Sequence, residues 1–146
     1  MPIPAKASTK SFMARRGRCY VDTSAFIAFL DRSDSHHALF LRLFASPPPL
    51  TTSALVIAEG HGWFLRRYDQ RRGAQFLAFV SMLPDLAIRA FDGDELDKAG
   101  AIAKKFGDQR LTLADAHGLA IMREEPPEWC WSTDRHLGLD GVPLVG

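Results

Sequence analysis

The stretch that decides the fold is RCYVDTSAFIAFL, residues 18–30. It opens with residues 19–21, three strand formers without polar alternation, which predict a central parallel strand covered on both faces. Asp22 is the first residue past that strand, and residues 23–30 form an apolar run that starts with two residues able to cap a helix. The stretch therefore predicts a strand, an acid and a helix in succession.

Asp22 allows two interpretations. In an open α/β sheet, ligands bind at the carboxyl ends of the strands, which is where Asp22 is expected to lie. A lone Asp at such a turn is equally well explained as the N-cap of the following helix. The choice between the two depends on whether the same pattern recurs along the chain.

Strands and helices alternate after residue 30. The sequence predicts helices over residues 36–45, 54–68, 74–83, 92–106 and 111–122, and strands over residues 50–52, 86–90, 129–131 and 142–145. This alternation, with right-handed crossovers, gives a parallel sheet with helices on both faces. We therefore expect an α/β fold, a three-layer α/β/α sandwich around a central, mostly parallel sheet of four to five strands.

Length and charge divide the chain into two parts. At 146 residues and 47% hydrophobic, it fits one domain with a sizeable core, which we expect over residues 18–146. Residues 1–17 are expected to form a flexible basic extension that attracts phosphates or has no role in binding. Residues 1–18 carry five basic residues and no acid, namely Lys6, Lys10, Arg15, Arg16 and Arg18. The remaining 128 residues carry a net charge of −4.

The composition excludes several classes of protein. The two cysteines, Cys19 and Cys130, are too few for a disulfide framework or a zinc finger. No apolar run is long enough to cross a membrane, and residues 1–17 lack the apolar segment of a secretory signal, so we expect a cytoplasmic protein. No pair of histidines has the HExxH-type spacing of a zinc site.

Three further acids stand in unusual places. Glu59 falls in the second turn of the predicted helix 54–68, among apolar residues, so its carboxylate must face solvent, find a partner or bind a cation. Asp134 follows the predicted strand 129–131, as Asp22 follows its own strand.

Asp115 again has two interpretations. It could form a capping box with Thr112. Alternatively, the small residues Ala114, Ala116 and Gly118 let its helix approach the sheet and bring the carboxylate to the strand ends.

A parallel sheet would bring these four acids to one edge: Asp22, Glu59, Asp115 and Asp134. Four converging carboxylates cannot all ionise without cations, and hard oxygen ligands suit Mg²⁺ or Mn²⁺. A cation held in this way can activate water for phosphodiester hydrolysis. Four arginines, Arg66, Arg67, Arg71 and Arg72, either contact phosphates or form a solvated face that pairs with Asp69.

Four short motifs together resemble the acidic motifs of PIN domains, in particular those of VapC-like toxins from type II toxin–antitoxin modules. They are VDTSA at residues 21–25, AE at 58–59, LADA at 113–116 and STDRHL at 132–137. The resemblance covers roughly residues 18–145, although Leu137 stands where the family commonly has an aromatic residue.

This resemblance implies a Mg²⁺-dependent ribonuclease, with Mn²⁺ as a possible substitute. Asp22, Glu59, Asp115 and Asp134 would be its metal-binding catalytic carboxylates, with Thr23 and Thr133 as polar support. Water would attack the RNA phosphodiester and leave a 5′-phosphate and a 3′-hydroxyl. The resemblance also implies a homodimer and a cognate antitoxin. The alternatives are a non-cleaving PIN-like module that binds RNA or protein, and a housekeeping RNA-processing nuclease.

Overall fold

The computed structural model describes residues 17–146, so residues 1–16, which include most of the predicted basic extension, lie outside the described part. The strands are β1 (Cys19–Val21), β2 (Leu50–Ser53), β3 (Leu86–Arg89), β4 (Cys130–Trp131) and β5 (Leu144–Val145). The helices are α2 (Thr23–Leu30), α3 (His37–Ala45), α4 (Ala54–Arg67), α5 (Gln70–Met82), α6 (Gly93–Lys105) and α7 (Leu113–Glu124), with a 3₁₀ helix η1 (Arg135–Gly138).

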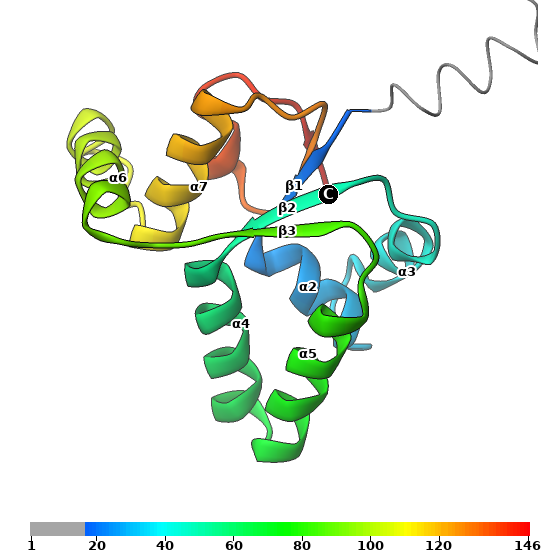
Figure 1. The fold of residues 1–146 in the computed structure, drawn as a ribbon. Helices are drawn as coiled ribbons and strands as arrows, with labels where there is room; N and C mark the ends of the chain where they lie inside the picture. Colours follow the sequence, from blue (N-terminus) through cyan, green and yellow to red (C-terminus); the bar gives the residue numbers. More distant parts are fainter. Residues whose placement is uncertain (1–16) are drawn as a thin grey trace, which may run out of the picture.

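The strands form one parallel sheet in the order β3-β2-β1-β4-β5. Figure 1 shows α2, α4 and α5 on one side of this sheet and α6 and α7 on the other. The predicted three-layer α/β/α architecture is therefore confirmed, with five strands. Because β1 lies at the centre, Asp22 at its carboxyl end is flanked by the ends of both β2 and β4.

Two apolar cores fill the space between the layers. The core under α2 to α5 is rich in phenylalanine, and the ring of Phe26 lies 5.7 Å from those of both Phe44 and Phe76. The core under α6 and α7 is built mainly from aliphatic residues, together with Tyr20. Both cysteines are buried, as expected for small core residues. Within residues 17–146, no helix is both long and apolar enough to span a membrane.

The largest boundary difference from the sequence prediction is at α5. This helix begins at Gln70, four residues before the predicted start, because Asp69 caps it by accepting a 2.9 Å hydrogen bond from the Arg72 amide. Apolar spacing does not predict this first turn, because it contains arginines in place of apolar residues. Ser53 caps α4 by accepting a hydrogen bond from the Val56 amide.

Gly118 allows α7 to lie close to the sheet. A Cβ atom at this position would be 3.0 Å from the Tyr20 hydroxyl oxygen and 3.1 Å from Cδ1 of Leu137, and both of these side chains are fully buried. Neither neighbour can withdraw without disturbing the core. The predicted role of small residues in this helix is therefore confirmed.

Gly118→Val should lower the free energy of unfolding by about 1–3 kcal/mol, because a larger side chain overpacks the contact of α7 with Tyr20 and Leu137. Gly100→Val in α6 is the matched control, since a Cβ there meets no atom within 4 Å. Chemical denaturation of the two variants measures the difference. Equal stability for both would contradict close packing at Gly118.

Candidate metal centre

Asp22 occupies the N-cap position of α2, but its side chain makes no capping hydrogen bond. Its Oδ2 atom instead accepts hydrogen bonds from the hydroxyls of Ser24, at 2.9 Å, and Ser132, at 3.0 Å. The residue is only 4% exposed. Helix capping therefore does not explain the position of the Asp22 carboxylate. This carboxylate faces the loop that follows β4.

Asp115 combines the two roles that the sequence presented as alternatives. Thr112 and Asp115 form a complete capping box, in which the Thr112 hydroxyl accepts from the Asp115 amide and Asp115 Oδ2 accepts from the Thr112 amide, each at 3.1 Å. The same Oδ2 lies 4.0 Å from Nδ1 of His136. The cap therefore fixes a carboxylate that also faces a second group of polar side chains.

Asp134 and His136 form that group in the turn after β4. Asp134 Oδ1 accepts the amide hydrogen of His136 at 3.0 Å and lies 3.1 Å from the Nδ1 atom of the same residue. Donor atoms of Asp115, Asp134 and His136 all lie within 4.8 Å of one another. Within residues 17–146, these three side chains form the group of potential metal ligands whose spacing suits one metal ion.

Two serines connect Asp22 to this group. Ser132 Oγ, which donates to Asp22, also accepts the amide hydrogen of Asp134 at 2.9 Å. Ser24 Oγ accepts the amide hydrogen of Thr133 at 3.0 Å and lies 3.2 Å from Ser132 Oγ. The end of β1 and the turn after β4 are thus held together by a short hydroxyl bridge.

The resemblance to PIN domains implies Thr23 and Thr133 as this polar support. Thr133 is exposed and takes part through its backbone amide, while the Thr23 hydroxyl is buried without a hydrogen-bond partner. Ser24, Ser132 and His136 were not singled out as site residues. A usable signal existed for Ser132, because it is the first residue past β4, in the position that Asp22 has after β1.

Burial controls the electrostatics of the centre. The pKa of Asp22 is raised from 3.8 to about 6, mainly by loss of hydration and to a smaller extent by the charge of Asp115, while the two serine hydrogen bonds oppose the rise. Burial also raises the pKa of Asp115, helped by the charge of Asp134 and opposed by Thr112 and His136. The folded chain alone therefore disfavours full ionisation of its own acids.

Glu59 lies apart from these contacts. It is exposed on α4, and within the described chain no hydrogen bond or ion pair joins it to Asp22, Asp115 or Asp134. Its carboxylate could face solvent, find a partner or bind a cation, and in the structure it faces solvent. Three of the four predicted acids are therefore interconnected, and the part of Glu59 in the centre stays a prediction.

The four predicted RNA-binding arginines differ in their surroundings. Arg72 is engaged within the protein, because it donates to the Leu30 carbonyl at 2.9 Å and its guanidinium lies 4.3 Å from the centre of the Tyr68 ring. Arg66, Arg67 and Arg71 are exposed near the tip of the α4–α5 hairpin. Asp69 serves as the cap of α5, and no ion pair joins it to these arginines in the described structure.

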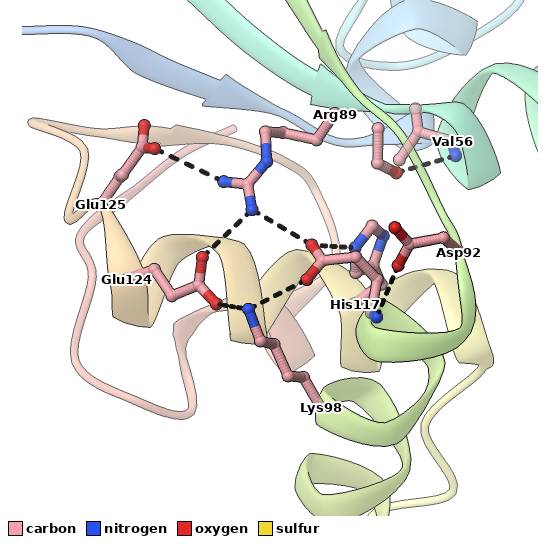
Figure 2. Close-up of polar contacts among 9 residues, drawn as sticks. Val56, Arg89, Asp92, Lys98, His117, Glu124 and Glu125 are labelled. Atoms are coloured by element: carbon pink, nitrogen blue, oxygen red, sulfur yellow. Dashed lines mark hydrogen bonds and ion pairs between the residues drawn. The ribbon is translucent and has the colours of Figure 1, made fainter.

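A network of charged side chains fixes the helix that carries Asp115. Figure 2 shows Arg89, at the end of β3, reaching Glu124 and Glu125 near the end of α7. Arg89 also pairs at 3.1 Å with Glu95 of α6, which lies 3.1 Å from Nε2 of the fully buried His117. Because its members come from β3, α6 and α7, this network ties both helices to the sheet.

The donor set of the centre fits a divalent cation. It offers carboxylate oxygens from three acids and one imidazole nitrogen, a combination found at sites for hard and borderline divalent ions. A cation would also offset the charge that burial makes unfavourable on Asp22 and Asp115. Asp115 and Asp134 are the acids placed to hold it, with Asp22 and His136 next to them.

Comparison with known proteins identifies the fold. A family model described as PIN domain matches residues 19–136. The structure of VapC20 from Mycobacterium tuberculosis, titled a sarcin–ricin loop cleaving toxin, aligns with a TM-score of 0.76 at 24% identity, over 85% of this chain and 95% of that one. No curated protein sequence was found to match.

Two further structures share the fold at lower similarity. A toxin–antitoxin complex from Klebsiella pneumoniae aligns with a TM-score of 0.58 at 19% identity, over 88% of this chain and 96% of that one. VapBC2 from Rickettsia felis, bound to a DNA fragment from its promoter, aligns with a TM-score of 0.59 at 13% identity, over 88% and 97%.

Without metal, stability should depend on pH through Asp22. Its pKa is higher in the folded state, at about 6, than its ordinary value of 3.8, so the folded state binds more protons between these values and loses stability as the pH rises through them. Lowering the pH from 7 to 5 should therefore add on the order of 1 kcal/mol to the free energy of unfolding. The measurement is denaturant unfolding in the presence of a chelator.

Asp22→Asn should remove this part of the pH dependence, because the amide is neutral at both pH values. Asp97→Asn, a change of an exposed acid on α6, should keep the slope of the unaltered protein. Acids with lowered pKa values, namely Asp31, Glu95 and Glu124, titrate below this window. An unchanged slope in Asp22→Asn would show that its carboxyl is not perturbed.

Proposed function

This chain belongs to the PIN domain family, and on that premise we propose that it is a divalent-cation-dependent ribonuclease that acts as the toxin of a toxin–antitoxin pair. The observation that supports this most is the convergence of Asp22, Asp115 and Asp134 at the carboxyl edge of the sheet. Carboxylate ligands suit either Mg²⁺ or Mn²⁺, and these are the proposed cations.

In this proposal, Asp115 and Asp134 hold the cation together with Asp22 and with Glu59, which would have to turn toward the centre. A cation held there would supply Lewis-acid stabilisation of the phosphodiester and would make water a stronger nucleophile. Ser24 and Ser132 keep the Asp22 carboxylate oriented through their hydrogen bonds. Water would attack phosphorus, the bond between phosphorus and O3′ would break, and O3′ would take up a proton, which leaves a 5′-phosphate and a 3′-hydroxyl.

The alternative of a non-cleaving RNA- or protein-binding module is less well supported. A binding surface does not need a group of buried acids that repel one another, whereas a cation-dependent hydrolase uses such a group to hold its cation. A housekeeping RNA-processing nuclease would use the same centre. The toxin role is favoured over it because the structural neighbours are a toxin and toxin–antitoxin complexes.

The proposed partners are an RNA substrate, a cognate antitoxin and a second copy of the chain, all in the cytoplasm. Exposed arginines of the α4–α5 hairpin, Arg66, Arg67 and Arg71, are the proposed phosphate contacts. Apolar side chains are exposed on the same hairpin, with Leu65 at 43%, Leu77 at 42% and Met82 at 80%. Such side chains are typical of a surface that another chain covers.

Asp115→Asn should lower Mg²⁺-dependent RNA cleavage by at least about a hundredfold, because it removes a charged ligand from the centre. The fold should persist, since the asparagine amide oxygen can still accept the capping bond from Thr112. The assay uses a sarcin–ricin loop oligonucleotide and an unstructured RNA, with and without chelator, alongside thermal melts.

Asp97→Asn on α6 is the matched control and should cleave like the unaltered protein. Cleavage by Asp115→Asn at an undiminished rate, or cleavage that survives the chelator, would contradict the proposed chemistry. Stoichiometric RNA binding with no cleavage under any divalent cation would favour the binding module.

The full chain should be a dimer at micromolar concentration, with about twice its 16.2 kDa mass in light scattering. Replacing Leu65 and Leu77 together by Glu should yield monomers if the hairpin is the contact. Leu41→Glu on α3, where the side chain is 50% exposed, is the control and should remain dimeric. A monomeric unaltered chain would contradict the proposed dimer.

A further inference from the structure

His136 brings a nitrogen donor to a group of carboxylates. Its Nδ1 atom lies 3.1 Å from Asp134 Oδ1 and 4.0 Å from Asp115 Oδ2, and the three donor atoms lie within 4.8 Å of one another. The side chain is 28% exposed, so it borders both the buried acids and solvent. One imidazole nitrogen therefore lies near both carboxylates.

These separations suit ligands of one ion. With metal–ligand bonds of about 2.1 Å, adjacent ligands of an octahedral ion are about 3.0 Å apart and opposite ligands about 4.2 Å apart. The Asp134–His136 separation of 3.1 Å corresponds to adjacent positions, and the Asp115–His136 separation of 4.0 Å lies between the two values. No large rearrangement is needed for all three to reach one cation.

The backbone holds His136 in this place. Its amide donates to Asp134 Oδ1 at 3.0 Å, and the next residue, Leu137, is fully buried and donates its own amide to the Asp134 carbonyl at 3.2 Å. The turn is therefore anchored on both sides of the imidazole. A positioned ligand loses little side-chain entropy when it binds an ion.

The chain contains a second Asp-x-His turn, and comparing the two turns shows which feature distinguishes the one at Asp134. Asp34 Oδ1 accepts the His36 amide at 2.8 Å and lies 3.6 Å from Nδ1 of that histidine, much as in the pair Asp134 and His136. Within residues 17–146, however, no further acid joins the pair at Asp34 to make a metal-binding group. The difference is Asp115, which faces the second turn and not the first.

We propose that His136 binds the cation directly through Nδ1, so that the centre is a mixed carboxylate–imidazole site that prefers first-row transition ions such as Mn²⁺ over Mg²⁺. Imidazole nitrogen is a good ligand for transition ions and a poor one for Mg²⁺, which prefers oxygen. This inference rests on the proposed cation-dependent function and adds a ligand and a metal preference to it.

Pulsed EPR of the full chain loaded with Mn²⁺ tests the inference directly, because a coordinated imidazole gives ¹⁴N modulation of the Mn²⁺ signal. The modulation should be present in the unaltered protein and should change to the ¹⁵N pattern after labelling with ¹⁵N-histidine. It should vanish in His136→Gln and persist in His36→Gln, the matched variant of the other Asp-x-His turn.

Displacement of Mn²⁺ by Mg²⁺ gives a second readout. Loss of a residue that only orients a metal ligand lowers metal affinity by about 10- to 100-fold, and loss of a direct ligand should lower it at least as much. His136→Gln should therefore release Mn²⁺ at an Mg²⁺ concentration at least about tenfold lower than the unaltered protein requires. Equal displacement in the two proteins would overturn the proposed metal preference.

Failure of this inference can be told apart from failure of the proposed function. Bound Mn²⁺ without nitrogen modulation, or modulation that survives in His136→Gln, would overturn the role of His136 and leave a carboxylate centre intact. Absence of Mn²⁺ binding, or binding unaffected by Asp115→Asn, would overturn both the inference and the proposed metal centre.

Discussion

The burial of the Asp22 carboxylate at the end of the central strand is the constraint on which the rest of this structure depends. Two serine hydroxyls are its side-chain hydrogen-bond donors within the described chain, and Asp115 lies close enough to repel its charge. Neutral donors recover only part of the hydration that a buried carboxylate loses, so its pKa rises to about 6. The buried Asp22 carboxylate therefore lowers the stability of the fold at neutral pH, and a cation bound beside it would restore that stability.

The surrounding structure prevents the acids from relieving this strain by moving apart. Gly118 lets α7 pack directly on Tyr20 and Leu137, which sets the distance of Asp115 from the sheet. The hydroxyl bridge of Ser24 and Ser132 ties the turn of Asp134 to the end of β1. The network around Arg89 holds the other end of α7 to β3, as Figure 2 shows. A site fixed from several directions keeps its charge geometry before any ligand arrives.

Much of this could be predicted from the sequence, because strand ends and helix starts have local signals. Asp22 and Asp134 follow short apolar strands, and that position alone places them at one edge of a parallel sheet. The serine contacts could not be predicted, since Ser24 meets Ser132 across 108 positions and only the tertiary fold decides which hydroxyl faces the acid. Histidine spacing does not predict His136 as a site residue, since its neighbours are carboxylates and one of them, Asp115, comes from α7.

Asp115 shows why a structural role and a chemical role should not be treated as exclusive. A carboxylate has about four acceptor sites, and the capping bond from the Thr112 amide uses one of them. That bond selects one rotamer of the side chain, so the ordering that a metal ligand requires is already complete in the folded helix. The same bond opposes the rise in the pKa of Asp115 that burial causes, so it helps to retain the charged form that a cation needs. The helix cap is therefore part of what prepares this acid for the centre.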